Sequence, residues 1–133
     1  MEDVNAEQLV SQAPGGGRKH PQVLLASSAA ALSRAAGVSV PDAGEGTYLV
    51  AFWGEKPTGG YSVQVRSVQT DGDRVKVHLS LEKPPKEAMV TQALTYPYAV
   101  AVVRNEDLAQ EKILLEDQGG RRLDWPVRVL EGG

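Results

Sequence analysis

Cysteine is absent from the 133 residues of this chain. Disulfide bonds, zinc sites built on thiolates and a cysteine nucleophile are therefore excluded. Histidine is scarce as well, since His20 and His78 are the two that occur. Neither has another histidine or a carboxylate at metal-ligand spacing, such as two positions away on a strand, so we expect no metal site.

Long apolar runs and an excess of basic residues are also missing. No apolar run approaches the roughly 20 residues that a helix needs to cross a bilayer, so we expect no transmembrane segment. The first residues, Met1-Glu2-Asp3, are acidic and no apolar signal core follows them. If the protein is exported, this sequence lacks its leader. The net charge of −3 argues against a nucleic-acid partner, which would require a concentrated basic face.

The usual signatures of catalysis and of cofactor binding are not found. No serine lies in a nucleophile-elbow setting, and nothing identifies a base for one. Gly15-Gly16-Gly17 does not form a phosphate loop, because Lys19 is followed by His20 rather than by serine or threonine. Most carboxylates, such as Asp71 and Asp117, fall in predicted turns where they are solvated. We therefore expect no cofactor and no enzymatic activity.

Turn-forming residues, in contrast, are abundant. Fourteen glycines and eight prolines in this short chain favour short strands over long helices. The length suits a single domain, which we place at residues 1–133. One helix is expected near residues 28–36, because Ser27 or Ser28 can cap its first turn, alanines follow, and Gly37 can end it.

Apolar patterning predicts the strands. Residues 47–53 and 98–103 are apolar almost throughout, which is typical of strands covered on both faces. Residues 75–81 alternate and predict a half-buried strand, while a slip of the alternation near Ser67 predicts a β-bulge. Residues 1–20 should form a partly ordered lead-in with a weak edge strand. Further strands are expected at 23–25 and 89–94, with a turn at 71–72. Towards the end of the chain we expect a helical turn at 106–108 and a closing hairpin at 111–130. The fold class is mainly β (α+β), an antiparallel β-sandwich or a partly open barrel.

Residues 54–61 form the stretch that joins the first doubly apolar strand to an alternating one. The prediction is a tight crossing in which Gly59 and Gly60 permit positive φ or close approach and Tyr61 plugs the core. Tyr61, Tyr96 and Tyr98 lie at loop-to-strand junctions. They either cap the core or form a recognition rim, since tyrosine offers contact area at low entropic cost.

Two separated motifs in this region resemble the bacterial PrcB-type family, whose founding type is a subunit of a protease complex. The first is an apolar strand followed by Gly54, a short spacer, Thr58-Gly59-Gly60-Tyr61 and an alternating strand. The second is the bend at Pro84-Pro85 followed by Thr95-Tyr96-Pro97-Tyr98 and an apolar strand. The resemblance covers about residues 47–104 and leaves the closing hairpin outside.

The resemblance implies a non-catalytic, protein-binding accessory domain that is extracytoplasmic or at the cell surface. Its partner would be another protein, with a protease as the first candidate. Two alternatives stay open. The segment 56–61 is similar to a loop of chagasin-type cysteine-protease inhibitors, and the tyrosines with Trp125 would suit a carbohydrate- or cell-wall-binding module. The candidate binding residues are Pro57, Thr58, Gly59, Gly60, Tyr61, Thr95, Tyr96, Pro97 and Tyr98.

Overall fold

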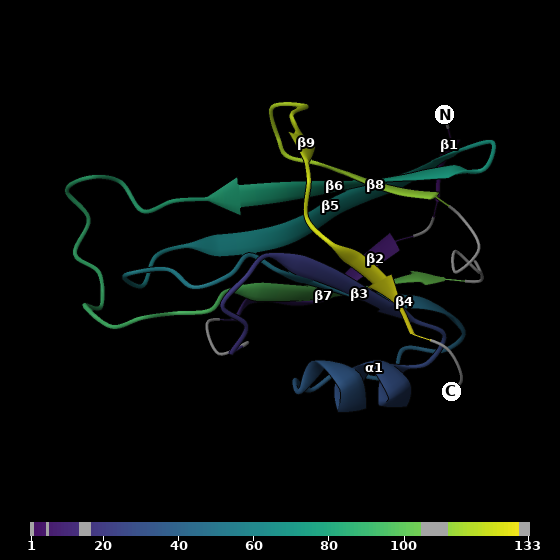
Figure 1. Cartoon of the computed structure of the whole chain (residues 1–133), viewed down its shortest axis with the longest axis horizontal. Coiled ribbons are helices and arrows are strands. Elements are labelled where there is room, and N and C mark those ends of the chain that lie inside the picture. Colours follow the sequence, from purple (N-terminus) through teal and green to yellow (C-terminus); the bar gives the residue numbers. More distant parts are fainter. Residues whose placement is uncertain (1, 5, 14–16, 105–111, 131–133) are drawn as a thin grey trace.

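Two five-stranded sheets pack face to face, and one helix covers the outer face of the second sheet (Figure 1). This computed structural model describes residues 2–4, 6–13, 17–104 and 112–130. The first sheet has the order β1 (Glu2–Asp3), β5 (Ser62–Asp71), β6 (Arg74–Glu82), β8 (Lys112–Glu116) and β9 (Arg122–Leu123). The second has the order β10 (Val127–Val129), β3 (Gln22–Ala26), β4 (Gly46–Phe52), β7 (Tyr98–Arg104) and β2 (Ala6–Ala13). The predicted mainly β sandwich with one helix is confirmed.

The two doubly apolar runs are β4 and β7, which pair with each other in the middle of the second sheet. Side chains on one face, such as Leu49 and Ala101, enter the core between the sheets. Those on the other face, such as Tyr48 and Val102, enter a second core beneath the helix α1 (Ala29–Ala36). A strand covered on both faces has no polar side, which explains its continuous apolar sequence.

The helix begins and ends where its sequence predicts. The Ser28 hydroxyl oxygen accepts a hydrogen bond from the Ala31 amide, and Gly37 follows the last turn with a φ of 75°. A contact that the sequence did not predict also holds the helix. Arg18, in the loop before β3, donates to the carbonyls of Ala35 and Ala36 and lies over the ring of Phe52.

The β5–β6 hairpin carries both predicted irregularities. Its register shifts between Val65 and Ser67, which leaves Arg66 as the extra residue of a bulge. The Val65 amide donates instead to the side chain of Gln8 on β2, in the opposite sheet. Gly72 forms the turn with a φ of 63°. The weak edge strand predicted within residues 1–20 is β2, at the edge of the second sheet.

One predicted element is wrong, and another is smaller than predicted. Residues 89–94 do not form a strand; they belong to a long connection between β6 and β7, where no strand lies alongside to pair with them. The closing hairpin at 111–130 is reduced to β8 and β9, because β10 crosses to the other sheet and pairs with β3 in parallel. The strand β8 also pairs in parallel, with β6. The helical turn predicted at 106–108 lies outside the described residues.

Candidate functional site

The two motifs of the sequence meet at one end of the sandwich, on the left of Figure 1. Residues 54–61 carry the chain from β4 in one sheet to β5 in the other, and residues 83–97 form the long loop between β6 and β7. We call the second segment the end loop. It extends beyond the strand ends, and residues 54–61 support its base.

Backbone hydrogen bonds join the two segments. Lys56 and Thr95 exchange a pair of them, at 2.8 and 2.9 Å, and form an isolated antiparallel bridge. The Gly59 amide donates to the Thr91 carbonyl oxygen at 2.9 Å. The Thr95 hydroxyl donates to the Thr58 carbonyl oxygen at 2.7 Å. Four of the predicted site positions, from 58 to 60 and at 95, therefore lie at this junction.

Glycine is required at position 60 by both conformation and space. Its φ is +90°, and a Cβ built there would lie 2.7 Å from Pro84 Cβ and 3.0 Å from Val90 Cγ1. A Cβ built at Gly59 would lie 3.4 Å from the Cβ of Thr91. The glycine pair thus lets the end loop pack directly on the backbone of residues 59–60.

The predicted aromatic residues lie in different surroundings. Tyr61 packs edge-on against Trp53 in the core between the sheets, with ring centroids 5.6 Å apart. Tyr98 instead packs against Phe52 in the core beneath α1. Pro97 is buried and Pro57 is exposed. The tyrosines therefore do not form one flat platform, although each keeps part of its surface accessible.

Two ionisable groups at this junction have shifted pKa values. The Nζ of Lys56 lies 4.3 Å from the centre of the Trp53 ring, and burial, followed by repulsion from Lys83, lowers the pKa of Lys56. The hydroxyl of Tyr96 donates to Glu55 at 2.9 Å. This hydrogen bond to a carboxylate is the main reason why the pKa of Tyr96 is raised. The Tyr96 hydroxyl thereby joins the end loop to residues 54–61.

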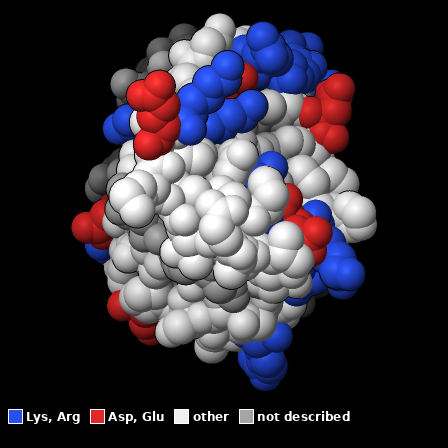
Figure 2. All heavy atoms as spheres, turned by 90° about the vertical axis from the view of Figure 1, so that its left-hand side faces the viewer, with Lys and Arg blue, Asp and Glu red and all other residues white. Residues whose placement is uncertain are grey.

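The sequence missed the residues that are most available to a partner. Met89 is fully exposed and Leu94 is 57% exposed, and these are the exposed large hydrophobic side chains among the described residues. Both lie in the end loop. Figure 2 faces this end of the molecule and shows a broad surface without charge, bordered by Lys, Arg, Asp and Glu. The signal for a loop here is Pro84-Pro85, because two adjacent prolines interrupt a strand.

Comparison with known families gives a match that includes this end of the molecule. The PrcB C-terminal family model matches residues 47–104. The resemblance that the two motifs predicted is confirmed over the same residues. No curated protein and no solved structure gives a match.

The PrcB C-terminal match corresponds to a defined part of the fold. It begins in β4, includes the 54–61 crossing, the β5–β6 hairpin and the end loop, and finishes at the end of β7. The contacts between Gly59, Gly60 and the end loop therefore lie inside the matched segment. The helix α1 and the strands β8 to β10 lie outside it.

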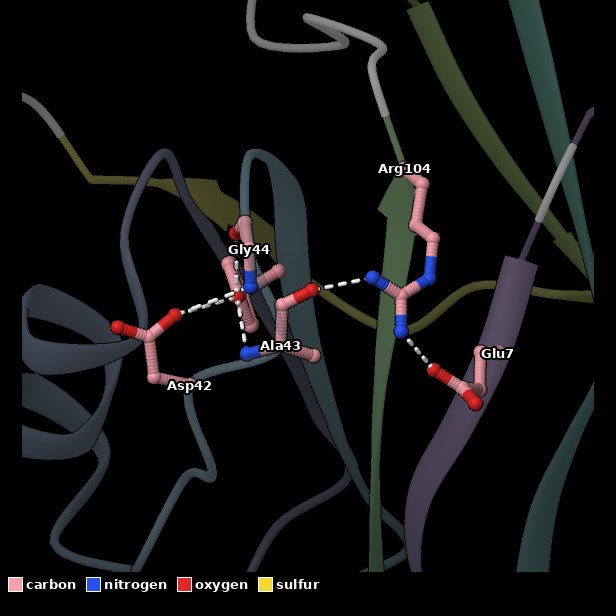
Figure 3. Close-up of polar contacts among 6 residues, drawn as sticks. Glu7, Asp42, Ala43, Gly44 and Arg104 are labelled. Atoms are coloured by element: carbon pink, nitrogen blue, oxygen red, sulfur yellow. Dashed lines mark hydrogen bonds and ion pairs between the residues drawn. The ribbon is translucent and has the colours of Figure 1, made fainter.

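A second polar cluster lies at the opposite end of β4 and β7 (Figure 3). The buried Tyr48 hydroxyl donates to the Gly44 carbonyl oxygen at 2.6 Å and accepts from the Ala43 amide at 2.8 Å. Arg104 donates to the Ala43 carbonyl oxygen and to the carboxylate of Glu7. These bonds fix the loop before β4 and join β2 to β7, so each polar group has a structural role.

Two hollows lie elsewhere on the described surface. One, of about 370 Å³, lies between the first turn of α1 and residues 42–45, beside Tyr48. Another of similar volume lies where the chain passes from β8 and β9 to β10, and Trp125 forms part of its wall. Within the described residues, no three His, Cys, Asp or Glu side chains gather closely enough to hold a metal ion. No described helix is long and apolar enough to cross a membrane.

Proposed function

We propose that this chain is a non-catalytic accessory domain that binds another protein within a protease complex. The end loop supports this proposal, because it presents Met89 and Leu94 to solvent at the end of the molecule that has a broad region without charged side chains. Exposed apolar side chains cost solvation free energy, and burying one in an interface contributes about 1.5–3 kcal/mol. The PrcB C-terminal match supports the association with a protease complex.

The contacts between residues 54–61 and the end loop favour a binding role for this loop. Hydrogen bonds from residues 56–59 hold the loop at Thr91 and Thr95, so less conformational freedom is lost when a partner binds. This arrangement also changes the role of the predicted site. Thr58, Gly59 and Thr95 position the loop, whereas Met89 and Leu94 make the contact. By resemblance to the same family, the proposed location is extracytoplasmic or at the cell surface.

Site-specific photocrosslinking tests the proposal. A photoreactive amino acid is placed at Met89 or Leu94 in the tagged chain, which is expressed in the source cells. We expect both positions to crosslink to the same protein, and we expect the recovered complex to react with an active-site probe for proteases. The matched control is Ala30, which is exposed on α1. Equal crosslinking from Ala30, or a complex without any protease, would count against the proposal.

A further inference from the structure

We propose that the outer edge of β10 binds an extended segment of another protein by antiparallel strand addition. The bound segment would carry an acidic residue between two apolar ones. It would continue the second sheet beyond β10, which is the yellow arrow in Figure 1. This edge lies outside residues 47–104 and does not include the end loop, so the inference does not rest on the proposed function.

The outer edge of β10 has backbone groups that the described residues leave unused. The Pro126 carbonyl oxygen accepts from the Val23 amide at 2.9 Å, and the Leu130 amide donates to β3 at 2.8 Å. Backbone groups of successive strand residues point alternately to the two edges of a strand, so those of Val127 and Val129 point away from β3. No described residue bonds to them. Such a row of unpaired N–H and C=O groups is a template for another strand.

Antiparallel addition makes full use of these two residues. Val127 and Val129 would each exchange two hydrogen bonds with the partner residue opposite, and Arg128 would lie opposite the partner residue between those two. Parallel addition would spread the same bonds over a longer segment and is slightly less stable per residue. We therefore expect the antiparallel register, which is centred on Arg128.

Arg128 determines the charge of the partner strand. Its side chain is exposed, and no described carboxylate forms an ion pair with it. Directly opposite side chains in an antiparallel pair lie close together, so opposite charges attract and like charges repel. The central partner residue is therefore aspartate or glutamate. A second copy of this chain in the same register would place Arg128 opposite Arg128, which disfavours pairing between copies.

The neighbours of the acidic residue would face the core between the sheets. Val127 and Val129 pack against that core, and the partner residues directly opposite them share their side of the sheet. Val127 also forms part of the wall of the hollow of about 370 Å³, together with Leu123 and Trp125. Apolar side chains at these two partner positions would be buried against this surface, which is favourable. The sequence pattern of the bound segment is therefore apolar, acidic, apolar.

Hydrogen exchange of the backbone amides, measured by NMR on the full chain, tests the hydrogen bonds. The probe is an acetylated peptide with the central sequence Val-Glu-Val, flanked by serines. At saturation we expect it to slow exchange of the Val127 and Val129 amides by about tenfold or more. The Arg128 amide points to β3 and is the internal reference, whose exchange should change little.

The charge preference is tested with a second peptide, in which lysine replaces the central glutamate. It should bind about tenfold more weakly, because an attraction to Arg128 becomes a repulsion. Arg128→Glu should reverse the preference. The matched control is Arg66→Glu, which makes the same charge change at the exposed bulge residue of β5 in the other sheet and should leave the preference within about twofold.

N-methylated peptides test the register. Methylation of the two valine amides removes donors that face β10 and should abolish binding, whereas methylation of the glutamate amide, which points away, should be tolerated. Circular dichroism checks that both variants are folded. The inference is overturned by unprotected Val127 and Val129 amides at about 1 mM peptide, by equal affinity for the two peptides, or by equal effects of the two methylations. Protection of both amides in the concentrated chain alone would show that copies pair through this edge, and it would overturn the inference as well.

Discussion

At Gly60 the backbone has a φ of +90°, and a methyl group would meet the side chains of Pro84 and Val90. Gly72 also has a positive φ, of +63°, but no atom lies within 4 Å of the Cβ that it lacks. The two glycines share a conformational requirement and differ in their surroundings. Their comparison therefore separates the cost of backbone strain from the cost of displacing the end loop.

We expect Gly60→Ala to be more destabilising than Gly72→Ala. Placing a side chain in a left-handed conformation costs about 1–2 kcal/mol at either position. At position 60 the methyl group must also displace Pro84 and Val90, so the total loss should exceed that of Gly72→Ala by about 1–3 kcal/mol. Urea unfolding measures the difference, and amide chemical shifts at Val90 and Thr91 should move in the first variant alone. Equal losses would mean that Gly60 contributes only its backbone freedom.

The sequence predicted much of the residue-scale architecture, because glycine, proline and periodicity report local geometry. The close approach at Gly60, the bulge near Ser67 and the core position of Tyr61 are confirmed. Met89 was assigned to a strand, because Met89, Val90 and Thr91 have the composition of one. Composition does not reveal whether another strand lies alongside, and here only single hydrogen bonds reach the segment.

Among the elements, the helix α1 can be predicted most directly from the sequence. The contact of Arg18 that holds its last turn cannot be predicted in the same way. Its cap, its alanines and its terminal glycine are local signals, all within ten residues of one another. Arg18, which binds the carbonyls of the last turn, lies 17 residues before Ala35 in the chain. Only the folded chain brings the two together. The same limit applies to β10, whose alternating valines suit a hairpin strand and a parallel strand equally well.

The contribution of α1 to stability can be measured through Leu32. This side chain is completely buried and lies in the core beneath the helix, with Tyr48 and Val50 of β4. Leu32→Ala should lower the free energy of unfolding by about 2–5 kcal/mol, because it removes buried apolar atoms and leaves a cavity. Arg34→Ala, on the exposed side of the same helix, is the control and should change stability by about 0.5 kcal/mol or less. A similar small effect at Leu32 would show that the helix is not part of the cooperative core.

For the molecule as a whole, both ends of the described chain join the two sheets. Near the start, β1 belongs to the first sheet and β2 to the second. Near the end, β8 and β9 belong to the first sheet and β10 to the second. The family match at residues 47–104 includes none of these strands, and it omits β3 and α1 as well. It retains two neighbouring strands from each sheet, β4 with β7 and β5 with β6.

We therefore expect residues 47–104 to be too small to fold alone. Without α1 and β3, one face of β4 and β7 would expose Tyr48, Phe52 and Val100, which are buried in the full chain. Pairs of strands are marginally stable in water, and two such pairs would have to hold each other.

The fragment should show no cooperative transition in thermal or urea unfolding, whereas residues 1–133 should show one. Residues 21–130, which restore β3, α1 and the strands β8 to β10, are the control and should unfold cooperatively. A fragment 47–104 with dispersed amide resonances would instead show that the matched segment is a folding unit by itself, and that the terminal strands only add stability to it.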